Sequence, residues 1–123
     1  MKLHLADTKN RYTVTGYGAG YLVVNGVRYA QPLIVTPDRD PAAWPVAEFD
    51  ALDATATGML LDSRPDIIVL GTGPTQRFAA PAVLRPLIEA GVGLETMNTP
   101  AACRTYNILM GEGRRVLAAM FLP

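Results

Sequence analysis

The sequence has little cysteine and histidine and no excess charge of either sign. It contains one cysteine, Cys103, and one histidine, His4, among 123 residues. A single cysteine excludes an intramolecular disulfide, and one cysteine with one histidine provides no metal-ligand spacing. The 11 basic and 11 acidic residues cancel. We therefore expect no resident metal. We also expect no nucleic-acid partner, since a phosphate-tracking surface usually shows as excess lysine and arginine.

Long hydrophobic runs are also absent. The longest continuous apolar stretch, residues 116–122, is too short to span a bilayer, and the first residues lack the apolar stretch of a signal peptide. Half of the residues are hydrophobic and 18% are charged, which is a globular balance. We therefore expect a single domain over residues 1–123, located in the cytoplasm and without a membrane span.

The first third of the chain has the pattern of short β-strands. Asn25 and Gly26 separate two apolar segments, residues 23–24 and 27–29, and this dipeptide favours a two-residue type I′ hairpin turn. Residues 33–35 predict another short strand, which Pro37 ends. The polar, proline-rich residues 38–45 predict an exposed loop.

The remaining two thirds alternate between helix and strand patterns. Apolar residues at helical spacing predict a helix over residues 50–63, which Asp50 can cap. A second helix is expected within residues 81–90, and the residues expected to face inward are Val83, Leu84, Leu87 and Ile88. Pro86 conflicts with a helix that begins at Pro81, so that helix either starts later or kinks.

Thr99 and Pro100 suit the N-cap and first position of a third helix. Residues 66–70 and 92–97 are expected to be parallel neighbouring strands, and residues 116–121 another interior strand. This order of elements predicts an α/β sandwich with a parallel or mixed central sheet and an N-terminal β-layer.

Two strand-to-helix loops, residues 71–77 and 97–100, are expected to meet at the carboxyl edge of the sheet, where open α/β sheets bind ligands. Glycines there permit close backbone approach, and free N–H groups at helix starts attract anions. The segment at residues 71–73 is neither a dinucleotide fingerprint nor a Walker loop. Tight structural turns, a site for a small anion, and catalysis therefore all stay open. The candidate ligand-binding residues are Gly71, Thr72, Gly73, Arg77, Met97, Thr99, Arg104, Thr105, Tyr106 and Asn107.

No catalytic set is evident. Cys103 lies near the start of the third predicted helix, where a thiolate is favoured. The single histidine, His4, lies near the N-terminus, so no Cys–His pair is expected. We therefore expect Cys103 to be structural and assign no catalytic residue.

Residues 71–73, the segment 97–109 (Met-Asn-Thr-Pro-Ala-Ala-Cys-Arg-Thr-Tyr-Asn-Ile-Leu) and residues 112–116 resemble a family of small α/β proteins. That family includes the mitochondrial complex I assembly factor 3 and the adipogenesis-associated Mth-type domain proteins. Residues 16–18 and 25–26 also match, so the resemblance covers nearly the whole chain. It implies a three-layer sandwich with a mixed, largely parallel central sheet, an N-terminal β-hairpin layer and no known cofactor.

Two functions follow from these observations. The resemblance implies a non-enzymatic interaction or assembly protein, whose partner would be a component of respiratory-complex assembly. The loops themselves favour binding or turnover of a small anionic ligand in the crevice at the carboxyl ends of the central strands.

Overall fold

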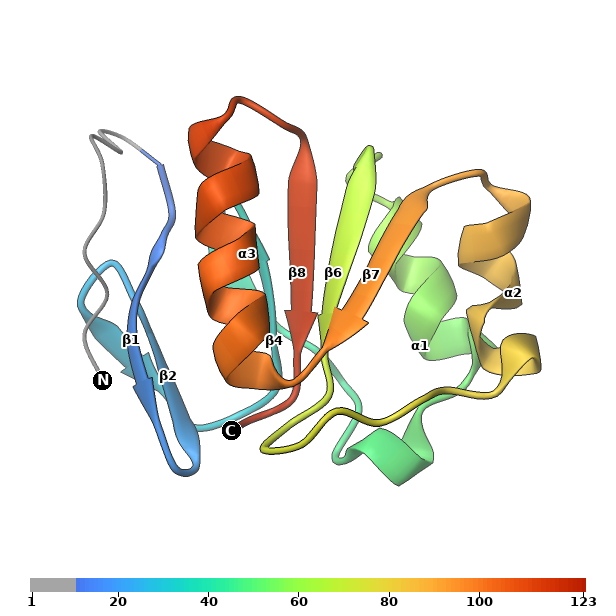
Figure 1. The fold of residues 1–123 in the computed structure, drawn as a ribbon, viewed down its shortest axis with the longest axis horizontal. Helices are drawn as coiled ribbons and strands as arrows, with labels where there is room; N and C mark the ends of the chain where they lie inside the picture. The colour runs from blue at the N-terminus through green and yellow to red at the C-terminus, as the bar shows by residue number, and fades with distance from the viewer. Residues whose placement is uncertain (1–10) are drawn as a thin grey trace.

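The computed structural model describes residues 11–123, and within them the chain forms two β-sheets and three α-helices in layers (Figure 1). His4 lies outside the described residues. The smaller sheet is antiparallel, in the order β1 (Val14–Gly18), β2 (Tyr21–Val24) and β3 (Val27–Tyr29). Its β2–β3 turn has positive φ at both Asn25 (47°) and Gly26 (81°), which confirms the predicted type I′ turn.

The larger sheet is mixed, with the strand order β5-β4-β8-β6-β7. The strands are β4 (Leu33–Thr36), β5 (Arg39–Ala43), β6 (Ile67–Gly71), β7 (Gly93–Met97) and β8 (Val116–Met120). β6 pairs in parallel with both β7 and β8, which confirms the predicted parallel neighbours, whereas β4 pairs antiparallel with β5 and β8.

The prediction of a loop over residues 38–45 is wrong, because β5 occupies its centre. β5 pairs only with β4, at the edge of the sheet. An edge strand tolerates a proline such as Pro41, since only one side of its backbone is hydrogen-bonded. Its side chains are mostly exposed, so it lacks the alternating apolar pattern that marks a half-buried strand.

β6 and β8 are buried on both faces and divide the core in two. Ile67 and Val69 contribute to the cluster that contains α3 (Thr99–Gly111) and the smaller sheet. Ile68 and Leu70 point to the opposite face, where they join the cluster formed with α1 (Ala54–Gly58) and α2 (Pro81–Glu89). This period-two alternation produces the three layers: α3 with the smaller sheet, the central sheet, and α1 with α2 (Figure 1).

The single helix predicted over residues 50–63 is wrong. The chain instead forms α1 between two 3₁₀ turns, Phe49–Ala51 and Met59–Leu61. Leu52 and Asp53 have extended backbone angles, which separate the first turn from α1. Asp53 rather than Asp50 caps α1, because its carboxylate accepts a hydrogen bond from the N–H of Ala56 (2.8 Å).

α2 begins at Pro81 and continues through Pro86, which settles the boundary that the sequence left open. The carbonyl that Pro86 leaves without an intrahelical donor belongs to the exposed Ala82, where water can satisfy it. The expectation that Ile88 faces inward is wrong, since Ile88 is 61% exposed and Leu87 is the buried residue of α2. No helix of residues 11–123 is long and apolar enough to cross a membrane.

Candidate functional site

The two strand-to-helix loops meet at the carboxyl edge of the central sheet, at the bottom of Figure 1. The N–H of Thr72 donates to the carbonyl of Met97 (2.9 Å), and the N–H of Thr99 donates to the carbonyl of Gly73 (2.8 Å). The expected meeting of the loops is therefore confirmed. It follows from the parallel pairing of β6 and β7, which leave the sheet at the same end.

Thr99 joins three segments at this edge. Its fully buried hydroxyl accepts a hydrogen bond from the N–H of Gly73 (2.8 Å) and donates one to the carbonyl of Phe121 (2.6 Å). The prediction that Thr99 caps α3 is wrong, because Asn98 is the N-cap and its side chain accepts from the N–H of Ala101 (2.9 Å). Thr99 instead connects the β6–α2 loop, α3 and the residue that follows β8.

Thr72 organises the rest of the β6–α2 loop. Its buried hydroxyl donates to the carbonyl of Thr75 (2.7 Å) and accepts from the N–H of Arg77 (3.1 Å). The backbone N–H groups of Thr72, Gly73, Arg77 and Thr99 therefore all have acceptors within the protein. An anion bound to these groups would have to displace those acceptors, and anion binding at this edge stays a prediction.

The two glycines of this loop meet structural requirements. A Cβ atom on Gly71 would lie 2.9 Å from the hydroxyl of Thr99 and 3.1 Å from side-chain carbons of both Ala102 and Met120. Gly73 has φ of 104°, a region that residues with a side chain rarely adopt. Both glycines thus permit the close approach of α3 and the chain after β8 to the end of β6.

The two candidate arginines lie against different neighbours. Arg77 forms an ion pair with Asp50 and stacks over the ring of Phe49, with 4.4 Å from its guanidinium carbon to the ring centre. Arg104 donates to the hydroxyl of Tyr17 (3.3 Å). A depression of about 240 Å³ beside Arg77 is lined partly by Thr72 and Gly73, whereas Arg104 does not line it.

The remaining candidates lie along α3 and contact other parts of the molecule. The hydroxyl of Thr105 donates to the sulfur of Met97 (3.2 Å). The side chain of Asn107 accepts from the N–H of Val14 (3.0 Å) and donates to its carbonyl (2.8 Å). The Asn107 side chain therefore bonds the backbone of β1 as a neighbouring strand would, and it links the smaller sheet to α3.

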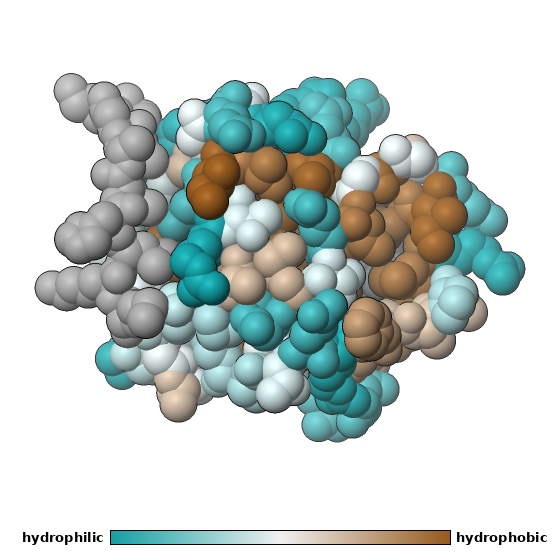
Figure 2. Space-filling model, in the orientation of Figure 1, coloured by the Kyte–Doolittle hydropathy of each residue, from teal (hydrophilic) through white to brown (hydrophobic). Residues whose placement is uncertain are grey.

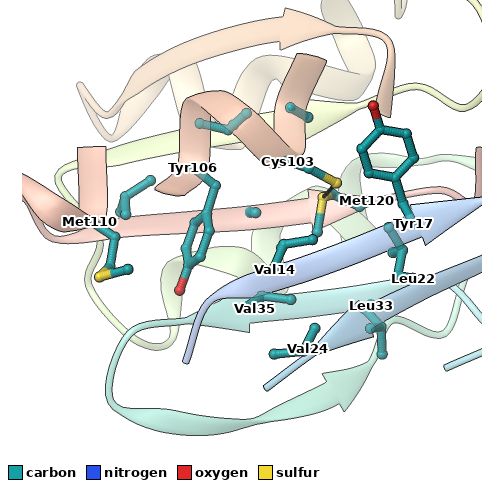
Figure 3. Close-up of a cluster of buried hydrophobic side chains, with 14 of the residues drawn as sticks. Val14, Tyr17, Leu22, Val24, Leu33, Val35, Cys103, Tyr106, Met110 and Met120 are labelled. Atoms are coloured by element: carbon teal, nitrogen blue, oxygen red, sulfur yellow. Dashed lines mark hydrogen bonds between the residues drawn. The ribbon is translucent and has the colours of Figure 1, made fainter. Parts of the chain in front are cut away.

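Tyr106 reinforces this junction from the core. Its fully buried ring lies beside Val14 in Figure 3, and its hydroxyl donates to the carbonyl of Tyr12 (2.7 Å). Burial raises the pKa of Tyr106 above its ordinary value. The pair Tyr106 and Asn107 thus positions the smaller sheet, and neither side chain faces the depression beside Arg77.

Cys103 is fully buried, with its sulfur 3.8 Å from that of Met120 (Figure 3). Burial raises the pKa of the Cys103 thiol to about 12, against the weaker opposing effect of Arg104. A neutral, enclosed thiol is a poor nucleophile. The structural role expected of Cys103 fits this environment. Within residues 11–123, no group of three or more histidine, cysteine or acidic side chains is placed to hold a metal ion.

We predict that Cys103 in the folded protein reacts with iodoacetamide at pH 8 far more slowly than in urea, because it is buried and its pKa is about 12. Mass spectrometry after timed alkylation measures the difference, with Cys103→Ala as the unreactive control. Rapid stoichiometric alkylation of the folded protein would contradict this slow reaction.

The burial of Cys103 also makes the stability of the fold depend on pH. Because the pKa of the thiol is raised from 9.0 to about 12 on folding, the stability gained by burying the neutral thiol is fully present below pH 9. That stability is lost as the pH rises from 9 to 12.

Exposed apolar side chains gather over α2 and β7, at the side of the central sheet that β7 ends (right of Figure 2). β7 is an edge strand, so one side of its backbone has no strand partner among residues 11–123. Ile88 on α2 is 61% exposed, and Leu84, Val92 and Leu94 are half-buried and pack against the core cluster on the α1–α2 face of the sheet. We call β7 and these four residues the β7 edge surface. Sequence periodicity missed it because Ile88 was assigned to the core face of α2.

The profile of a family described as "Protein of unknown function (DUF498/DUF598)" matches residues 14–121. A Bos taurus protein named "NADH dehydrogenase [ubiquinone] 1 alpha subcomplex assembly factor 3" is 32% identical over 112 residues, which cover 89% of this chain and 60% of that protein. The chain thus spans less than two thirds of this relative.

Solved structures show the same fold. A crystal structure of a Bordetella parapertussis protein has a TM-score of 0.88 and 40% identity, covering 95% of this chain and 100% of that chain. A solution structure from Bordetella pertussis, described as a Mth938-like domain, has a TM-score of 0.79 and 37% identity, covering 98% of this chain and 92% of that chain.

Proposed function

The chain belongs to the DUF498/DUF598 family, and from this premise we propose that it is an assembly factor that binds a protein subunit of a respiratory NADH dehydrogenase. The proposal rests on the relatives named as assembly factors of such an enzyme. They share sequence with this chain over 89% of its length, so the shared part includes the layers described above.

The β7 edge surface supports a protein partner. An edge strand presents unpaired backbone N–H and C=O groups, to which an extended segment of another protein can add as a further strand. Exposed apolar surface over α2 and β7, including the 61% exposed Ile88 of α2, would be covered by such a partner. We therefore propose that the subunit docks along β7, with Ile88 at the contact.

Co-purification tests this function. The tagged chain, expressed in its source organism, is expected to enrich subunits of NADH dehydrogenase, identified by mass spectrometry. The variant Ile88→Lys is expected to reduce that enrichment at least tenfold, because it places a charge in an apolar contact.

Ile108→Lys is the matched control. Ile108 is 62% exposed on α3, which packs on the opposite face of the central sheet from α2, and it receives the same change of side chain. Enrichment equal in Ile88→Lys and wild type would contradict docking at this surface. If the purified wild-type chain forms a dimer and Ile88→Lys abolishes it, docking of a subunit at this surface is also contradicted, since the surface then binds a second copy.

We propose a small anion in the depression beside Arg77 as a second candidate function. The observation in its favour is that Thr72, Gly73 and Arg77 all line this depression of about 240 Å³. Arg77 would have to exchange its ion pair with Asp50 for one with the ligand. Amide shifts concentrated at Thr72 and Gly73 during titration with acetate, and lost in Arg77→Gln, would support this site.

A further inference from the structure

A pocket rich in arginine lies at the opposite edge of the central sheet, where β6 and β8 begin. It has a volume of about 280 Å³, and we call it the arginine pocket. Four arginine residues line it, from three separate parts of the chain: Arg11, Arg39, Arg114 and Arg115. The turn between α3 and β8, at the top of Figure 1, supplies the last two.

The positive charge of this pocket is poorly balanced. Asp38 is the acidic residue that lines it. Arg115 forms an ion pair with Asp66 (3.3 Å), whereas no ion pair within residues 11–123 involves Arg39 or Arg114. Four arginines that line one pocket concentrate positive charge there, and a bound anion would neutralise part of that charge.

Arg11 and Ser63 add two further features to the pocket. The half-buried Arg11 donates to the carbonyl of Met110 (2.8 Å) in the last turn of α3, where a cation also favours the helix dipole. Ser63 lines the same pocket, and its hydroxyl oxygen is buried without a hydrogen-bond partner among the described residues. Such a hydroxyl is costly to leave unpaired, and a rotation of the Ser63 side chain toward the pocket would let it donate to an oxygen of a ligand.

We propose that the arginine pocket binds a phosphate group, either free or as the monoester of a small molecule. Guanidinium groups match phosphate oxygens in geometry and charge, and one phosphate offers enough acceptors for several arginines and a serine hydroxyl. The volume lies close to the lower bound of about 300 Å³ for small-ligand pockets. This site is separate from the β7 edge surface and independent of the proposed assembly role.

Titration of the full, ¹⁵N-labelled chain with inorganic phosphate, followed by NMR at constant ionic strength, tests the proposal. Saturable amide shifts are expected at Ser63 and at residues 113–116. Arg114→Gln is expected to weaken binding about tenfold, because it removes one charged hydrogen-bonding group. Parallel titrations with glycerol phosphate and acetate distinguish a monoester from the free ion and from a carboxylate.

Arg85→Gln is the matched control, since it removes one exposed positive charge from α2, outside the pocket. Unchanged affinity in Arg85→Gln and reduced affinity in Arg114→Gln would support the site, provided both spectra otherwise match wild type. Equal affinity in the two variants would overturn it. So would non-saturating shifts spread over all exposed arginines, or shifts confined to Thr72, Gly73 and Thr99.

Discussion

Replacing Thr99 by valine is expected to lower the free energy of unfolding by about 2–4 kcal/mol, because two buried backbone groups lose their partner and each such loss costs about 1–3 kcal/mol. The two groups are the N–H of Gly73 and the carbonyl of Phe121, which the Thr99 hydroxyl bonds at 2.8 and 2.6 Å. Valine keeps the size of threonine, so little of the change arises from a cavity. Urea denaturation of the two proteins measures the difference.

Thr99→Ser is the control for this prediction. Serine keeps the hydroxyl and removes only the methyl group, so it should retain most of the stability. If Thr99→Ser is as unstable as Thr99→Val, packing of the methyl group rather than the two hydrogen bonds holds this edge together. If Thr99→Val is as stable as wild type, the hydroxyl does not join the three segments.

Replacing Gly71 by alanine is expected to lower the free energy of unfolding by about 1–3 kcal/mol, the usual cost of adding a methyl group to a packed core. The new Cβ would lie 2.9 Å from the Thr99 hydroxyl and 3.1 Å from carbons of both Ala102 and Met120. Residues of both α3 and β8 surround Gly71. A shift of α3 or of β8 that makes room for the new methyl group would therefore disturb packing elsewhere in the core. Thermal denaturation should show a lower midpoint.

Gly111→Ala provides the matched control. Gly111 is the last residue of α3, and a Cβ there would meet nothing within 4 Å. Alanine at this position is expected to be neutral or slightly stabilising, since it reduces the entropy of the unfolded chain. A similar loss of stability in Gly71→Ala and Gly111→Ala would contradict the steric explanation.

The features that sequence predicted best depend on strong local signals. The doubly apolar β6 and β8 and the Asn25-Gly26 turn form as expected, because their patterns match one structure. The cap of α3 was misplaced by one residue because Asn98 and Thr99 are both good N-caps. The choice between them depends on Gly73 and Phe121, which approach Thr99 only in the folded chain.

The candidate site was predictable in its topology but not in its contacts. Parallel strands bring the two loops together, and this required only the order of elements. That their N–H groups already have protein acceptors depends on side chains such as Thr72. The arginine pocket was missed, although Arg114 and Arg115 are adjacent in the sequence, because Arg11, Arg39 and Ser63 join them only through the fold.

The amount of assembled NADH dehydrogenase in a strain of the source organism that lacks this chain tests the proposed assembly role most directly. Native gel electrophoresis of its membranes is expected to show less assembled enzyme. Wild type and Ile108→Lys should restore the amount, whereas Ile88→Lys, expressed at the same level, should not. A strain that assembles the normal amount of enzyme without this chain would contradict the account.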